Sequence, residues 1–227
     1  MSPLGWLAAL FLLALLLALG ATLFVVLTEG RFGGRRLVEA VYDRAGPRLF
    51  ARETDAGRWR VLAGDLGLRP DATSLDVGCA TGDLVLSWAA LDGFHGVAVG
   101  IDRSRPMLEA AEKLAADRGL THATRFLGAD VDDGLPVPDG AVDTLTCLGV
   151  LEVVRRPEAL AAELARVLAP GGRLAVSLYR RAPAGVRELD FDGYVSLLRP
   201  LGFEAFEARP CRHQHDVVLA TRVATSR

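Results

Sequence analysis

Glycines and carboxylates recur at short intervals in the middle of the chain. The first group lies in Leu75-Asp76-Val77-Gly78-Cys79-Ala80-Thr81-Gly82-Asp83-Leu84, a short apolar segment followed by a glycine-containing turn. Gly78 and Gly82 let the backbone approach a ligand closely, and a helix that begins behind them presents free N–H groups. The GxxxG spacing differs from the GxGxxG of dinucleotide-binding turns, which disfavours a pyrophosphate site.

Two further turns carry groups that suit a nucleoside, and a third would line the same cleft. Asp102 ends the next apolar segment, about 20 residues beyond Gly82, where a carboxylate can accept both hydroxyls of a ribose. Asp130, in the run Gly128-Ala129-Asp130-Val131, offers a carboxylate and a neighbouring backbone N–H to an adenine edge. Leu148 and Gly149 end a fourth apolar segment and would line the same cleft. The competing interpretations are that each aspartate only caps a helix and that the glycines serve the turn alone.

Alternating strands and helices are needed to bring these turns together. Short apolar runs predict strands at Ser74–Val77, Gly96–Ile101, Thr124–Leu127, Val142–Leu148 and Arg173–Leu178. Helical periodicity predicts helices at Asp83–Ala90, Arg105–Asp117 and Pro157–Leu168. Such alternation predicts a parallel sheet between layers of helices, with ligands at the carboxyl edge of the strands.

The two ends of this region show different patterns. Pro170-Gly171-Gly172 predicts a helix end that turns directly into the next strand. Tyr194–Leu198 is typical of a helix, and Gly202–Glu207 and Asp216–Val223 of two strands. Because the connection between these strands is too short for a crossover helix, they should be antiparallel neighbours.

The N-terminal segment Pro3–Leu27 contains no charged residue. As a helix it would be about 37 Å long, enough to cross a hydrocarbon core of about 30 Å. A cleaved signal peptide is the main competing interpretation, because Ala18-Leu19-Gly20 offers small residues for cleavage, but no basic residue precedes the apolar run. The nearby arginines all follow the segment, which favours a single-pass membrane protein with its domain in the cytoplasm.

The composition of the chain excludes several classes of protein and kinds of site. The 26 basic and 28 acidic residues give a net charge of -2, which excludes a basic nucleic-acid binder. Three cysteines without a CxxC pair indicate neither a disulfide framework nor a zinc ribbon. His213 and His215 have no third ligand signal near them, so no metal is predicted.

The order and spacing of four runs resemble a known family. LDVGCATGDL, GIDRSRPML, FLGADVDDGLPVPDGAVDTL and LARVLAPGGRLAVSL are similar to class I S-adenosylmethionine-dependent methyltransferases, especially those that act on quinones, lipids and other small molecules. The resemblance covers about residues 70–180. It implies an α/β, three-layer Rossmann-like methyltransferase fold, with a seven-stranded, mostly parallel sheet whose last strand is antiparallel. With one N-terminal transmembrane helix, the expected parts are an anchor (1–28), a linker (29–34), a helical cap (35–69) and a methyltransferase domain (70–227).

The resemblance also implies roles for individual positions. The methionine part of the cofactor, S-adenosyl-L-methionine, would lie against Asp76, Gly78, Cys79, Ala80, Thr81 and Gly82. Asp102 resembles the ribose-binding acid, with Arg103 and Met107 beside the adenosine, and Asp130 and Val131 resemble the adenine-binding pair. Leu148 and Gly149 would face both the methionine part and the substrate.

Two positions depart from the family pattern. Ala80 replaces a common glycine, a change that we expect to be tolerated if its φ is negative. Val153 stands where relatives often have a histidine. No catalytic residue is predicted, since Glu152, placed at the cleft edge, is equally well explained as a carboxylate at a helix start.

The resulting hypothesis is a membrane-anchored methyltransferase that acts on a small, lipophilic, membrane-dissolved acceptor. Tyr42, Phe50 and Trp59 of the cap would meet this acceptor or simply pack on the sheet. A soluble thiol or protein acceptor, arsenite held by Cys79 and Cys147, a non-catalytic nucleoside-binding scaffold and an NAD-dependent enzyme are the alternatives.

Overall fold

The computed structural model describes residues 3–27, 43–44, 46, 55–180, 187–211 and 215–224. The expected linker 29–34 lies outside the described residues, as does most of the first part of the expected cap, including Tyr42 and Phe50. His213 also lies outside them. The proposed domain boundaries therefore stay predictions.

The described residues form one seven-stranded sheet in the order β3-β2-β1-β4-β5-β7-β6. β1 to β5 run parallel, and β7 is antiparallel to both of its neighbours, β5 and β6. The predicted mostly parallel sheet with an antiparallel last strand is confirmed. The strands are β1 (Thr73–Val77), β2 (Val97–Asp102), β3 (Thr124–Gly128), β4 (Val142–Cys147), β5 (Leu168–Tyr179), β6 (Phe203–Arg209) and β7 (His215–Arg222).

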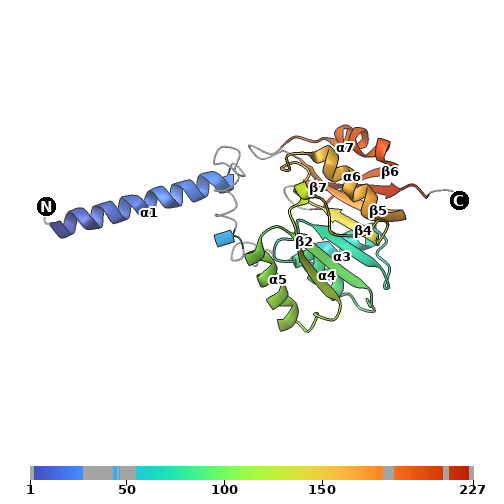
Figure 1. Cartoon of the computed structure of the whole chain (residues 1–227), viewed down its shortest axis with the longest axis horizontal. Coiled ribbons are helices and arrows are strands. Elements are labelled where there is room, and N and C mark those ends of the chain that lie inside the picture. The colour runs from blue at the N-terminus through green and yellow to red at the C-terminus, as the bar shows by residue number, and fades with distance from the viewer. Residues whose placement is uncertain are drawn as a thin grey trace.

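Helices cover both faces of this sheet (Figure 1). Alternate residues of β5 separate the faces: Leu174 and Val176 pack with α6 and α7, whereas Ala175 packs with α3 and α4. This alternation follows from the two-residue period of a strand and makes three layers. The helices are α3 (Ala56–Asp65), α4 (Asp83–Ala89), α5 (Arg105–Asp117), α6 (Pro157–Val167) and α7 (Phe191–Leu198), with short 3₁₀ turns at η1 (Val131–Asp133) and η2 (Arg199–Leu201).

The helix α6 passes directly into β5, as predicted, but Pro170-Gly171-Gly172 lie inside the strand and not before it. β5 already begins at Leu168, and the three residues lie inside it, at a register shift opposite Val142 and Thr144. A Cβ on Gly172 would lie 2.8 Å from the Ala169 carbonyl oxygen, so the backbone passes too close here for a larger residue. A bulge thus replaces the turn.

The helix α1 spans Pro3–Leu27 and lies apart from the sheet and its helices in Figure 1. Within α1 the structure describes the side chains of Trp6 and residues 10–21 only. No helix among the described residues combines the length and the apolar character needed to cross a membrane. The membrane anchor stays a prediction.

Candidate functional site

The four turns predicted to form the site meet at one edge of the sheet. Val77, at the end of β1, is in register with Ile101 of β2 on one side and Cys147 of β4 on the other. Asp102 of β2 is in turn opposite Gly128 of β3. Strand order reverses between β1 and β4, and ligands of doubly wound sheets bind at such a reversal.

The glycine turn after β1 is fixed by its backbone. The N–H groups of Gly78 and Cys79 both donate to the Ile101 carbonyl, at 2.8 and 3.0 Å. Gly78 and Gly82 have φ values of +82° and +75°, and Cβ atoms on them would lie 2.4 Å from Val150 Cγ2 and 2.8 Å from the Phe126 ring. Glycine is therefore required at both positions by the turn itself, whatever else it does.

Ala80 does not meet the condition under which we expected an alanine to be tolerated, a negative φ. Its φ is +46°, in the left-handed region, which costs roughly 1–2 kcal/mol for a residue with a Cβ. Its N–H donates to Asp102 Oδ2 at 2.9 Å, so the strained residue links the glycine turn to the end of β2.

Asp102 has the geometry of a ribose acceptor. Oδ2 takes the N–H of Ala80, and Oδ1 takes the N–H of Ser104 at 2.8 Å. A carboxylate has about four acceptor positions, so capacity remains for ribose hydroxyls, and the ribose contact of Asp102 stays a prediction. Burial raises the pKa of the Asp102 carboxyl, and these backbone N–H groups and nearby Arg103 oppose that rise.

The other predicted residues around the adenosine are placed differently. Arg103 is exposed beside Asp102, whereas Met107 on α5 is 2% exposed and has little surface to offer a ligand. Asp130 accepts the N–H of Asp132 at 3.1 Å and so caps η1, as the competing interpretation expected. Val131 is half-buried at the start of η1. The adenine contacts of Asp130 and Val131 stay predictions.

Three predicted residues around the methionine part are nearly fully buried. Asp76 accepts a hydrogen bond from Thr146 Oγ1 at 2.7 Å, and Cys79 and Thr81 lie below the surface of the turn. Burial raises the pKa of the Cys79 and Cys147 thiols, and nearby carboxylates add to the effect. Because the thiolate is the form that binds soft ligands, this disfavours the arsenite alternative.

In the turn after β4, the burial of Glu152 differs from both expectations for this residue. Leu148 is half-buried and Gly149 adopts a φ of +74°, as a turn lining a cleft can. Glu152, however, is 3% exposed, so it stands neither at an open cleft edge nor as a solvated carboxylate at a helix start. Val153, the position where relatives often have a histidine, is 49% exposed and apolar.

Two contacts near the site were not predicted. Asp83, next to Gly82, accepts a hydrogen bond from Trp59 Nε1 at 2.6 Å, which ties α3 to the start of α4. Ser104 Oγ donates to Asp43 Oδ1 at 2.5 Å, which brings the segment before α3 close to the Asp102 turn. Neither pair is signalled by sequence spacing, because 24 and 61 residues separate the partners. No group of three or more potential metal ligands is found among the described residues.

The seven-stranded sheet, the antiparallel last strand and the four turns at the β1/β4 reversal are those that the resemblance to class I S-adenosylmethionine-dependent methyltransferases led us to expect. Residues 75–176 match the family model described as "Methyltransferase domain".

Curated relatives share this region. The chain is 40% identical over 144 residues to a demethylmenaquinone methyltransferase of Thermus thermophilus, covering 63% of this chain and 64% of that protein. It is 35% identical over 136 residues to the ubiquinone/menaquinone biosynthesis C-methyltransferase UbiE of Azotobacter vinelandii, covering 60% and 53%. The chain thus spans between about half and two thirds of the length of these relatives.

Solved structures agree on the fold. The [4+2]-cyclase SpnF superimposes with a TM-score of 0.70 at 23% identity, covering 83% of this chain and 96% of that one. A SAM-dependent methyltransferase from Aquifex aeolicus gives a TM-score of 0.67 at 21% identity, covering 78% and 98%. At these identities the likeness shows the shared fold alone.

Proposed function

We propose that this protein transfers a methyl group from S-adenosylmethionine to a small, lipophilic acceptor of the quinone type. The observation that carries the proposal is the Asp102 carboxylate, held by Ala80 and Ser104 at the strand-order reversal with capacity left for a ribose. The choice of acceptor class is supported by the names of the curated relatives, which are quinone methyltransferases.

The protein's part in such a reaction is chiefly orientation. S-adenosylmethionine supplies an already activated methyl group when it is bound. The chain would hold the ribose through Asp102 and shape the methionine end with the turns at Gly78–Gly82 and Leu148–Gly149. Fixing the reacting atoms about 3 Å apart in an aligned geometry lowers a barrier by up to about 7–11 kcal/mol. The exposed, apolar Val153 suits an acceptor without charge at this edge.

We further propose that Pro3–Leu27 anchors the protein in a membrane with the domain in the cytoplasm. The support is the charge-free sequence of α1 and the arginines that follow it, Arg31, Arg35 and Arg36. An anchor would keep the site close to acceptors dissolved in the bilayer and raise their effective concentration.

The direct test supplies a methyl-labelled donor to the full chain in lipid vesicles that contain a demethylated isoprenoid naphthoquinone. We expect label in the quinone, and we expect Asp102→Ala to weaken binding of S-adenosylhomocysteine by at least about tenfold, because buried hydroxyl contacts are lost. Asp117→Ala is the matched control, since Asp117 ends α5 and pairs with Lys113 at the surface. Binding without any labelled product would favour the scaffold alternative, and wild-type affinity in Asp102→Ala would overturn the site.

Topology has a separate test. Protease added to intact spheroplasts should leave the domain uncut until the membrane is opened. Digestion before lysis would overturn the cytoplasmic placement.

A further inference from the structure

A buried carboxylate lies behind the turn that follows β4. Glu152 Oε1 accepts a hydrogen bond from Ser177 Oγ of β5 at 2.5 Å and another from Tyr194 OH of α7 at 2.7 Å. Glu152 is 3% exposed and its two partners are fully buried. One carboxylate oxygen therefore joins three segments of the chain in the interior.

The direction of these hydrogen bonds follows from proton counting. The Tyr194 hydroxyl keeps its proton, because burial and the adjacent Glu152 carboxylate hold its pKa far above the usual range. Ser177 has a single hydroxyl proton, which it gives to Glu152 Oε1. The Ser177 oxygen is then the acceptor for the N–H of Gly149, at 2.7 Å.

Gly149 is a backbone position that needs fixing. Its φ of +74° lies in the left-handed region, and a Cβ there would come within 3.2 Å of the Tyr179 hydroxyl. It follows Leu148 at the edge where the cofactor's methionine part and the acceptor would meet. A small rotation of this turn would move the surface that aligns them, and an ångström of misplacement is costly in such a reaction.

The stability of the fold does not explain why a carboxylate is buried at position 152. Burying it raises the pKa of Glu152, and within the part of the chain that the structure describes its second oxygen, Oε2, is buried without a hydrogen-bond partner. An apolar side chain of similar volume at such a place is often as stable as a buried charge. What Glu152 provides instead is an acceptor that fixes the rotation of the Ser177 hydroxyl.

We propose that Glu152 is a positioning residue, which acts through Ser177 to hold the Gly149 backbone in the conformation that binds the methionine part of the cofactor. This inference rests on the proposed function, because it assumes that Leu148–Gly149 lines the cofactor site. It assigns no proton transfer to Glu152.

Ser177 and Tyr194 provide a matched pair for the test, because both donate to the same oxygen but only Ser177 reaches Gly149. The affinity of the full chain for S-adenosylhomocysteine is measured by calorimetry, beside its urea unfolding midpoint. We expect Ser177→Ala and Glu152→Leu each to weaken binding by about fivefold, the worth of one hydrogen bond. Tyr194→Phe should stay within about twofold of wild type, and Glu152→Gln should too, because its amide oxygen still accepts from Ser177.

The double variant Glu152→Leu/Ser177→Ala should bind no more weakly than Ser177→Ala alone, since both changes interrupt one chain of hydrogen bonds. Equal losses of affinity in Ser177→Ala and Tyr194→Phe would reduce Glu152 to a structural role and overturn the inference. Wild-type affinity in a folded Glu152→Leu or in Ser177→Ala would also overturn it. If only Asp102→Ala weakens binding, the proposed function stands and this inference fails; if the wild type itself does not bind, both fail.

Discussion

Ala80 carries the most direct conflict between residue type and backbone in the site. Its positive φ suits a glycine, and the hydrogen bond from its N–H to Asp102 holds it there. We expect Ala80→Gly to raise the free energy of unfolding by about 0.5–1 kcal/mol, because the relief of left-handed strain exceeds the entropy cost of a new glycine. Urea unfolding of the full chain measures this difference.

A helical alanine is the control for that substitution. Ala116 is exposed on α5, where glycine should lower the free energy of unfolding by up to about 1 kcal/mol. Changes of the same sign at both positions would show that Ala80 is not strained in solution.

Glu152 predicts a pH dependence whose sign can be worked out. The pKa of its carboxyl is raised in the folded chain, mainly by burial, from an ordinary value of 4.5. Below that pH both the folded and the unfolded chain hold the proton, so Glu152 adds no pH dependence to the free energy of unfolding. As the pH rises, the unfolded chain ionises first, so the folded state loses stability until its own pKa is passed.

The variant Glu152→Gln isolates this effect. The free energy of unfolding of wild type minus that of Glu152→Gln should fall as the pH rises above about 4.5. Cys147 and Tyr194, which also face the carboxylate, stay protonated across this range because their own pKa values are raised. A difference that grows with pH would mean that the hydrogen bonds from Ser177 and Tyr194 outweigh burial.

Ala80 and Glu152 show what could not be predicted about single residues from the sequence. The positions of Asp102 and Gly78 relative to the strands were predicted, because a strand end followed by a turn is a local pattern. The φ of Ala80 depends on Asp102, 22 residues away, and the burial of Glu152 depends on Ser177 and Tyr194, 25 and 42 residues away. No local pattern contains that information.

Among the elements, the parallel strands were the most predictable. β1 begins one residue before the predicted Ser74, and α5 has the predicted bounds, because short apolar runs and amphipathic periods are strong signals. The bulge at Pro170-Gly171-Gly172 was not predictable, since the same residues make ordinary turns. What distinguishes it is the pairing with β4, which only the folded sheet defines.

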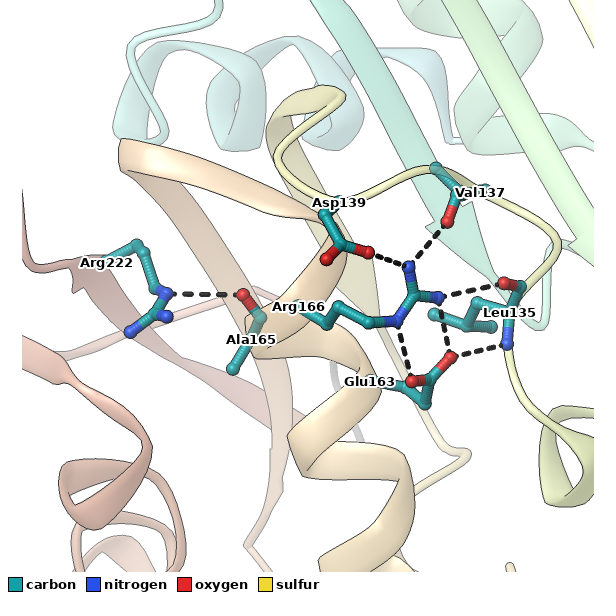
Figure 2. Close-up of polar contacts among 7 residues, drawn as sticks. All are labelled: Leu135, Val137, Asp139, Glu163, Ala165, Arg166 and Arg222. Atoms are coloured by element: carbon teal, nitrogen blue, oxygen red, sulfur yellow. Dashed lines mark hydrogen bonds and ion pairs between the residues drawn. The ribbon is translucent and has the colours of Figure 1, made fainter.

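One arginine joins the long connection before β4 to α6, as Figure 2 shows. Arg166 donates to the carbonyls of Leu135 and Val137, at 3.0 and 2.8 Å, and to the carboxylates of Asp139 and Glu163, at 2.7 Å each. Glu163 in turn accepts the N–H of Leu135 at 2.8 Å. The arginine and glutamate together therefore hold residues 134–141, which form no strand or helix.

We expect Arg166→Met to lower the free energy of unfolding by about 2 kcal/mol, because several charged hydrogen bonds are lost and the Glu163 carboxylate loses its cation. Urea unfolding measures the loss. Arg105→Ala is the matched control: Arg105 pairs with Glu109 but its side chain is 84% exposed, so its loss should cost within about 0.5 kcal/mol. Equal effects would show that the network in Figure 2 contributes no more than a surface ion pair.

At the scale of the whole molecule, the fold alone does not determine which reaction is catalysed. The same topology superimposes on a [4+2]-cyclase and on a SAM-dependent methyltransferase with nearly equal TM-scores. Function on such a fold depends on its site and on what reaches that site. The proposed function has three separate supports. They are Asp102 for a nucleoside cofactor, the names of the curated relatives for a quinone acceptor, and the charge-free α1 for delivery of that acceptor from a membrane.

Delivery of the acceptor from a membrane leads to a prediction about the intact protein. Leu13→Arg/Leu17→Arg places two charges in the middle of α1, each of which costs about 2.5–3.5 kcal/mol at the centre of a bilayer. The variant should leave the membrane fraction, while its affinity for S-adenosylhomocysteine stays within about twofold of wild type. Methylation of a long-chain quinone in vesicles should fall by at least about tenfold, because the effective concentration of the acceptor is lost.

A short-chain, water-soluble quinone supplies the internal control, since its methylation should not change in the variant. Leu13→Ile/Leu17→Ile keeps the apolar surface of α1 and should behave as wild type in every assay. Loss of activity toward both quinones would point to a damaged domain instead of lost access. Full activity on vesicles in a variant that no longer sediments with membranes would separate the anchor from substrate access and leave α1 without a part in the reaction.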